Sequence, residues 1–263
     1  MSKPTLPIGI FDSGLGGLSI LSEIHRQLPK ENIIYFADSG NAPYGEKSPE
    51  NIIEFSIKNT DFLLSKGCKL IVVACNTATT NAIHILREKF NVPFIGIEPA
   101  IKPAAIKTTT KQIGILATKG TLSSELFAQN LKRMSQKTNI IEVVGKGIVE
   151  AIENNTVDTL HFHKALQSQL SPFINSNIDH LVLGCSHYPL ITNNLKKIFN
   201  KNVKIIDSGF AVAKQTKNIL DYHKLLNNDE THKSTIDIYH NEASEIALKH
   251  VLNQLNIDNA IIH

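Results

Sequence analysis

Short runs of β-branched and other apolar residues alternate with helical patterns along most of the chain, and this alternation limits the folds open to it. The runs that predict strands lie at 8–11, 32–37, 69–74, 93–97, 112–117, 140–144, 180–184 and 203–206. Strands separated by helices are typical of a parallel sheet with helices on both faces. The sequence therefore predicts an α/β protein with mainly parallel sheets.

Two blocks of sequence recur in the same order in the second half of the chain. IGIFDSGLGG, from Ile8, matches IGILATKGTL, from Ile113, and LIVVACNT, from Leu70, matches HLVLGCSH, from His180. Each half has a strand and a polar loop, followed later by a strand, a cysteine and a polar pair. Because two matched blocks in one order indicate an internal repeat, we expect two pseudo-symmetric α/β domains.

Charge and hydropathy narrow the classes of partner. The 263 residues carry a net charge of +3 and the pI is near 8.6, and the lysines are scattered, so nucleic acid binding is not expected. The first residues lack the apolar segment of a signal peptide, and no stretch is long enough to cross a bilayer. We expect a cytoplasmic protein that binds a small molecule and no membrane, and a homodimer stays open.

The chain has three cysteines, Cys68, Cys75 and Cys185. Their odd number and the lack of CxxC spacing favour neither a disulfide framework nor a zinc site. We therefore expect free thiols and no bound metal, and we assign Cys68 no chemistry.

Polar residues follow several of the predicted strands, where open α/β sheets collect their ligands. These strand-end residues are Asp12, Ser13, Cys75, Thr118 and Cys185. If the two halves face each other about a pseudo-twofold axis, the repeat places one thiol on each side of a shared cleft. The sequence thus predicts an active site between the two domains.

Two thiols on opposite sides of one substrate suit the inversion of a stereocentre. That reaction needs a base on one face of the carbon and an acid on the other, with the roles exchanged in the reverse direction. A cysteine, with an unperturbed pKa of about 8.5, can serve in both roles. His187, two residues after Cys185, is a candidate proton partner.

The glycine run GLGG at 14–17 also allows a dinucleotide-binding interpretation, with Asp38 near the position of the ribose ligand. Ser19 stands where the third glycine is needed, and Asp12 would bring negative charge close to a pyrophosphate. We therefore interpret GLGG as a close-packing turn.

Five segments together identify a family: IGIFDSGLGG, YFADSGNAPYGEKS, VVACNTATT, GILATKGT and LGCSHYPL. Through them the chain resembles, almost end to end, the glutamate racemases of the cofactor-independent aspartate/glutamate racemase superfamily. The resemblance implies isomerase activity without a cofactor, interconversion of L- and D-glutamate, and supply of D-glutamate for peptidoglycan in cell wall biogenesis. A bacterial cytoplasm is implied as well.

The same resemblance assigns roles to residues. Cys75 is expected to take the α-proton from D-glutamate and Cys185 from L-glutamate. Asp12 and His187 would assist the adjacent thiols, with Glu150 acting near His187. The implied substrate contacts are Asp12, Ser13, Tyr44, Gly45, Asn76, Thr77, Thr118, Thr121, Ser186 and His187. The segment before Glu150 reads VVGKG where a Cys-Pro pair is usual, so the Glu150 assignment has less support than the cysteines.

The resemblance and the helical pattern of GFAVAKQTKNILDYH also set the domain boundaries. We expect a first domain of residues 1–97 and 208–263, carrying Asp12 and Cys75, and a second of 98–207, carrying Glu150, Cys185 and His187. Three alternatives stay open: racemisation of aspartate or another acidic amino acid, a glutamate-binding protein without catalysis, and a thiol redox switch.

Overall fold

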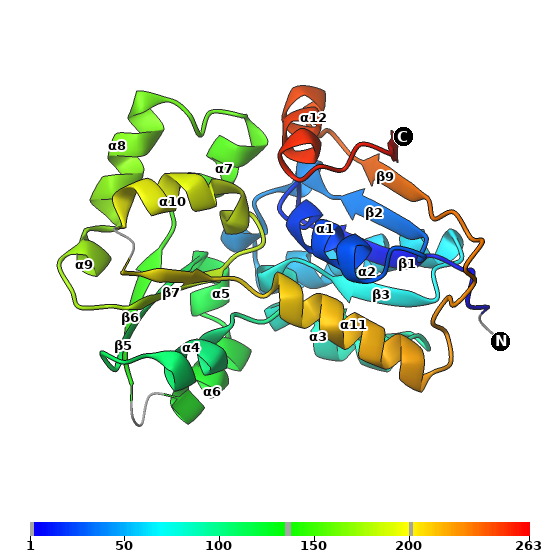
Figure 1. Ribbon diagram of the computed structural model, residues 1–263, viewed down its shortest axis with the longest axis horizontal. Coiled ribbons are helices and arrows are strands. Elements are labelled where there is room, and N and C mark those ends of the chain that lie inside the picture. Colours follow the sequence, from blue (N-terminus) through cyan, green and yellow to red (C-terminus); the bar gives the residue numbers. More distant parts are fainter. Residues whose placement is uncertain (1–2, 135–137, 200–201) are drawn as a thin grey trace.

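The computed structural model describes residues 3–134, 138–199 and 202–263. Its strands form two sheets, and every strand pairing among these residues is parallel. The six-stranded sheet has the order β10-β9-β2-β1-β3-β4 and the four-stranded sheet the order β6-β5-β7-β8. Figure 1 shows the sheets in two lobes that lie side by side. The predicted α/β class with parallel sheets is confirmed.

The six-stranded sheet consists of β1 (Ile8–Asp12), β2 (Ile33–Ala37), β3 (Leu70–Val73), β4 (Phe94–Gly96), β9 (Ile236–His240) and β10 (Ala260–Ile262). The four-stranded sheet consists of β5 (Gln112–Ala117), β6 (Asn139–Val144), β7 (His180–Gly184) and β8 (Lys204–Ile206). The order β2-β1-β3-β4 is repeated as β6-β5-β7-β8. The two halves therefore share a topology, as the repeated sequence blocks predict.

Helices flank both sheets. The lobe of the six-stranded sheet carries α1 (Leu18–Gln27), α2 (Pro49–Ser65), α3 (Asn76–Lys89), α11 (Gly209–Tyr222), α12 (Glu245–Gln254) and the 3₁₀ turns η1 (Ser39–Asn41) and η2 (Tyr44–Glu46). The other lobe carries α4 (Ile101–Lys107), α5 (Lys119–Leu122), α6 (Glu125–Met134), α7 (Ile148–Glu153), α8 (Leu160–Gln169), α9 (Ser171–Ile174), η3 (Tyr188–Ile191) and α10 (Thr192–Ile198). Because helices cover the sheets, β1, β3 and β7 are buried at every residue.

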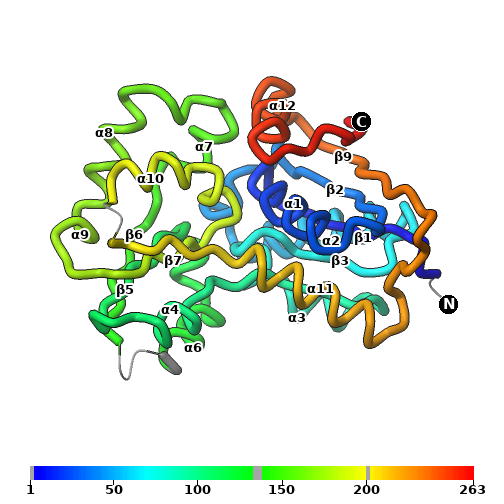
Figure 2. Tube along the Cα trace, viewed as in Figure 1, coloured from blue at the N-terminus to red at the C-terminus, as the bar shows by residue number. Residues whose placement is uncertain are grey.

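The chain crosses from the first lobe to the second after β4 and returns between β8 and α11 (Figure 2). After the return, α11 packs against α1, and β9 pairs with β2. Strands β9 and β10 are additions that the eight predicted runs do not include. The predicted boundaries at residues 97 and 208 fall in the two crossings, and the exact division into domains stays a prediction.

No helix in the described part of the chain is both long and apolar enough to span a membrane.

Candidate active site

The carboxyl ends of equivalent strands in the two sheets carry the predicted reactive groups. The register of the parallel pairings brings the end of β1 beside β3 and the end of β5 beside β7. In this way the fold delivers Asp12 and Cys75 from one sheet and Thr118 and Cys185 from the other. These strand ends meet where the lobes are in contact.

Cys75 is the N-cap of α3, so its sulfur lies at the start of a long helix. Its Sγ accepts a hydrogen bond from the backbone N–H of Ala78 at 3.4 Å and donates one to Ser13 Oγ at 3.6 Å. The residue is only 4% exposed. Burial and the negative charge of Asp12 raise the pKa of the Cys75 thiol, and Cys185 adds to the rise. Cys75 is thus a thiol at neutral pH, and it lies close enough to Cys185 for the two groups to interact electrostatically.

Cys185 follows β7 directly and is 7% exposed. Its sulfur lies 4.0 Å from Nδ1 of His187, and the same nitrogen lies 3.9 Å from Oδ2 of Asp12. Burial alone lowers the pKa of His187, but contacts with Cys185, with a glutamate described below and with Asp12 together hold it well above its usual value. The raised pKa favours the protonated form of His187, whose Nδ1 is in reach of the Cys185 sulfur.

Asp12 joins the two sides of the site. Its Oδ2 accepts a hydrogen bond from the N–H of Gly17 at 2.7 Å, and Ser186 Oγ, from the opposite lobe, lies 3.2 Å from both of its oxygens. Burial raises the pKa of Asp12, against the opposing effects of His187 and the Gly17 N–H. The N–H of Gly17, in the GLGG turn, is thus hydrogen-bonded within the protein.

The carboxylate next to His187 belongs to Glu153 and not to Glu150. Oε1 of Glu153 lies 2.6 Å from Nε2 of His187. Glu150, one turn earlier on α7, lines a hollow of about 200 Å³ together with Gly45 and Thr118. The sequence does not distinguish Glu153 from Glu150, because both glutamates of GIVEAIE are plausible on one helix and only the packing of α7 separates them.

Three predicted substrate contacts form a cluster of hydroxyl groups across the lobes. Thr77 Oγ1 lies 3.0 Å from Thr118 Oγ1 and 3.3 Å from Thr121 Oγ1, and the latter two lie 3.0 Å apart. Thr118 is also the N-cap of α5, accepting from the N–H of Thr121 at 3.2 Å. Hydroxyls that either donate or accept can re-orient toward a carboxylate.

Asn76, the first residue of α3, has unused hydrogen-bonding capacity. Both polar atoms of its carboxamide are buried, and neither has a partner among the residues that the structure describes. A buried carboxamide without partners is costly, so this group indicates a position for a ligand. Asn76 is one of the predicted substrate contacts.

Tyr44 has a structural partner. Its hydroxyl donates to Oδ2 of Asp38 and accepts from Asn59 Nδ2 at 3.0 Å, while Asn241, at the end of β9, also donates to Asp38. Burial and the negative charge of Asp38 raise the pKa of Tyr44. The tyrosine side chain thus fixes the loop that carries Gly45, and a contact between Tyr44 and substrate stays a prediction.

The glycines of the GLGG turn lie against the opposite lobe. A Cβ on Gly14 would lie 2.1 Å from Oε1 of Glu153, and a Cβ on Gly16 would lie 2.3 Å from Nδ1 of His187. Only glycine allows the turn to approach this closely, as expected for a close-packing turn.

Cys68 lies outside this constellation. It is a buried thiol, and burial raises its pKa to about 12. Within residues 3–134, 138–199 and 202–263 no group of three or more His, Cys, Asp and Glu side chains is arranged to hold a metal ion.

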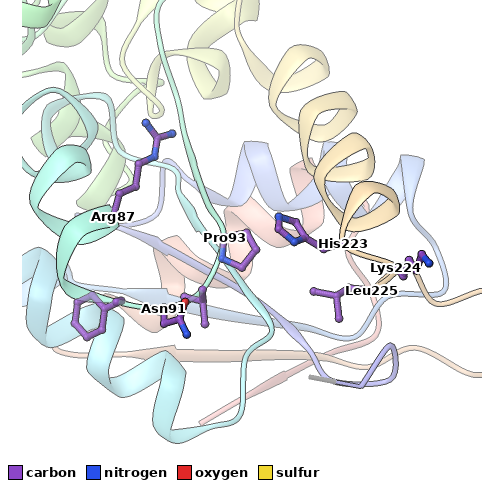
Figure 3. A pocket seen from close by; sticks show the side chains of 8 residues that line it. Arg87, Asn91, Pro93, His223, Lys224 and Leu225 are labelled. Atoms are coloured by element: carbon purple, nitrogen blue, oxygen red, sulfur yellow. The ribbon is translucent and has the colours of Figure 1, made fainter. Parts of the chain in front are cut away.

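A separate hollow of about 710 Å³ lies at the other end of α3 (Figure 3). Arg87 and Asn91 line it on one side and His223 and Lys224, which follow α11, on the other. Arg87 lies 12 residues after Cys75, which is the N-cap of α3, so the two are roughly 18 Å apart along the helix. None of the residues that line this hollow is a predicted site residue.

Comparison with known proteins gives one consistent result. Residues 8–216 match the family model described as Asp/Glu/Hydantoin racemase. A glutamate racemase of Ralstonia pickettii is 45% identical over 213 residues, which cover 81% of this chain and 76% of the relative.

Two solved structures are similar over nearly the whole chain. Glutamate racemase of Francisella tularensis in complex with D-glutamate has a TM-score of 0.83 and 30% identity, covering 98% of this chain and 96% of that one. Escherichia coli glutamate racemase in complex with L-glutamate and the activator UDP-MurNAc-ala has a TM-score of 0.83 and 32% identity, covering 95% of each chain.

Proposed function

The chain belongs to the Asp/Glu/hydantoin racemase family, and from this premise we propose that it interconverts L- and D-glutamate by proton transfer between two thiols. One observation carries the proposal. Cys75 and Cys185 follow equivalent strands of the two sheets. Ser13 contacts Cys75, and its chain neighbour Asp12 contacts Ser186 and His187. His187 in turn contacts Cys185.

The reaction balances without another reagent. A thiolate takes the α-hydrogen of glutamate as a proton, and the electron pair stays on the α-carbon, stabilised by the adjacent carboxylate. The thiol on the opposite face then donates its proton to that carbon. Cys75 acts as the base on D-glutamate and Cys185 on L-glutamate, so one complete inversion exchanges the protonation states of the two cysteines.

The thiol on each side has a partner that can move its proton. Nδ1 of His187 lies 4.0 Å from the Cys185 sulfur, and the raised pKa of His187 favours a proton on the ring. Asp12 and Ser13 lie on the Cys75 side, where Ser13 Oγ is 3.6 Å from the sulfur. General acids and bases of this kind contribute factors of about 10²–10⁴ to a rate.

The substrate's carboxylates need donors, and the site has neutral ones. The first of these hydrogen-bond donors is the unpartnered carboxamide of Asn76. The others are the hydroxyls of Thr77, Thr118, Thr121, Ser13 and Ser186 and the backbone around Gly45. Glu150 borders the adjoining hollow, where it would lie near the entering substrate. The product, D-glutamate, serves peptidoglycan synthesis in a bacterial cytoplasm. The oligomeric state that we propose to test is a homodimer, by size measurement in solution.

The proposal is tested with purified protein and L- or D-glutamate in D₂O. We expect optical inversion of both enantiomers, with one solvent deuterium entering the α-position, as NMR and polarimetry measure. Parallel samples with L- and D-aspartate test whether the protein racemises this shorter amino acid instead. Binding without exchange would indicate a glutamate-binding protein instead. Reversible loss of both thiols on mild oxidation, with no exchange before it, would favour a redox switch.

A further inference from the structure

Asp38 follows β2 directly and is the centre of a buried hydrogen-bonded cluster. Its Oδ1 accepts from Asn41 Nδ2 at 2.8 Å and from Asn241 Nδ2 at 2.5 Å. Its Oδ2 accepts from the Tyr44 hydroxyl and from Asn59 Nδ2 at 3.4 Å. All four donors are neutral, and a buried carboxylate depends on such donors because it has lost its hydration. The cluster therefore joins η1, η2 and α2 to the segment after β9.

Asn241 reaches this cluster from the returning C-terminal segment and also binds the backbone of the loop. Strand β9 pairs with β2, with His240 opposite Ala37. The N–H of Asn241 donates to the carbonyl of Ala37 at 3.2 Å, and the N–H of Gly40 lies 3.1 Å from Oδ1 of Asn241. The Asn241 carboxamide thus donates to Asp38 through Nδ2 and accepts from Gly40 through Oδ1.

The loop that Asn241 contacts is long only in the first lobe. Strands β2 and β6 occupy equivalent positions, but residues 38–48 follow β2, whereas residues 145–147 alone separate β6 from α7. The longer loop contains η2, which packs against α5 of the opposite lobe, and Gly45 of η2 lines a hollow together with Thr118. In the part of the chain that the structure describes, β6 is an edge strand, whereas β2 has β9 on its outer side. The longer loop and the additional strand therefore occur together.

We infer that Asn241 is a positioning residue: through Asp38 it holds the loop of residues 38–46, and thereby the backbone of Gly45, in the conformation that binds glutamate. The inference rests on the proposed function, in which Gly45 contacts the substrate. A hydrogen bond to a charged group shifts a conformational equilibrium about 10- to 100-fold. Its loss lowers the population of the ordered loop, and the apparent affinity for the substrate falls with that population.

Asn241→Ala tests the inference, because it removes both side-chain bonds to the loop. The matched control is Asn253→Ala, at an exposed position of α12 in the same C-terminal segment. The first measurement is hydrogen exchange by mass spectrometry without substrate. We expect the peptide that covers residues 38–47 to exchange about tenfold faster or more in Asn241→Ala, and the peptide of β2 to exchange as in the parent and the control.

The second measurement is steady-state racemisation of L- and D-glutamate. In Asn241→Ala we expect KM to rise at least about fivefold for both enantiomers and kcat to stay within about twofold of the parent, because bound substrate restores the order of the loop. A merely structural role would lower thermal stability without separating KM from kcat in this way.

A double variant tests the route through Asp38. Tyr44→Phe removes the hydroxyl that donates to Asp38. If Asn241 acts through the same carboxylate, the double variant should raise KM about as much as the more affected single variant, because the same loop is released in each. A KM increase equal to the product of the two single effects would show independent action and would overturn the inference.

Unchanged exchange of residues 38–47 in Asn241→Ala, or a KM equal to that of the parent, would overturn it as well. If Asn241→Ala does not fold, Asn241→Ser, which shortens the side chain but keeps it polar, takes its place with the same expected results. A parent protein that does not racemise glutamate would refute the proposed function, while hydrogen exchange would still report whether Asn241 orders the loop.

Discussion

Gly45 faces Thr118 so closely that a Cβ on Gly45 would lie 2.9 Å from the Cβ of Thr118. Gly45 belongs to η2 of the first lobe, and Thr118 is the N-cap of α5 in the second. The Thr118 hydroxyl also belongs to the cluster with Thr77 and Thr121. The closed site therefore depends on a glycine at position 45.

Gly45→Val tests this dependence. The valine side chain would push η2 away from Thr118, so we expect glutamate binding to weaken about tenfold or more while Tm changes little, since Gly45 lies outside the core. Steady-state kinetics and thermal unfolding measure the two effects, and Lys47→Ala, an exposed neighbour, is the control. A collapse of Tm with normal binding by the residual folded protein would make the loop purely structural.

The reactivity of Cys75 should depend on Asp12. Because burial and Asp12 raise the pKa of Cys75, little thiolate exists at neutral pH, and alkylation by iodoacetamide should accelerate as the pH rises. Asp12→Asn removes the negative charge, lowers the pKa of Cys75 and should increase its alkylation rate at a fixed pH near 8, as peptide mass spectrometry would report. Cys68 is the internal control, and an unchanged or slower Cys75 rate would contradict the assigned electrostatics.

Sequence patterns were sufficient for the fold class and for the two cysteine loops, because strand ends and repeated blocks are local features. The structure adds the contacts among the residues that the sequence predicts. These contacts join Ser13 to Cys75, Asp12 to Ser186, and Thr77 to Thr118 and Thr121.

Glu153 could not be found in this way. Its three donors, at positions 15, 39 and 187, are far apart in sequence, and Glu150 on the same helix is an equally good candidate by spacing. Likewise, Asn241, which follows β9, donates to Asp38 from more than 200 residues away, and no local pattern encodes this contact.

Removal of one partner of the buried ion pair between Lys69 and Glu31 should destabilise the first lobe. Both side chains are at most 1% exposed, Lys69 also donates to the carbonyl of Leu225, and Glu31 accepts from the N–H of Asn227. Glu31→Gln leaves a buried lysine charge uncompensated, so we expect the free energy of unfolding to fall by about 3–5 kcal/mol.

Urea unfolding measures this change. Glu54→Gln, which breaks the exposed pair with Lys58, is the control and should cost at most about 0.5 kcal/mol. Equal and small losses of unfolding free energy in the two variants would contradict this. The buried pair would then not stabilise the packing of the C-terminal segment around Leu225 and Asn227.

Racemisation should need no added cofactor, because two thiols supply both the acid and the base. Protein dialysed exhaustively against a chelator is expected to keep its full turnover and to show no pyridoxal absorbance. Lost turnover that a metal or pyridoxal phosphate restores would refute the two-thiol mechanism as a complete account.

The most direct test of the central claim, that Cys75 and Cys185 act on opposite faces of one carbon, is elimination by the two serine variants. In Cys75→Ser and Cys185→Ser, racemisation of glutamate should fall by about 10²–10⁴-fold, because a hydroxyl is a far weaker acid than a thiol. Cys68→Ala, the control, should racemise at close to the parent rate. The second substrate is a glutamate analogue with a leaving group on Cβ, which eliminates after proton removal from one face only. Cys75→Ser should still eliminate from its L form through Cys185. Cys185→Ser should still eliminate from its D form through Cys75. A preference of both variants for the same enantiomer, or racemisation by Cys185→Ser near the parent rate, would contradict the account.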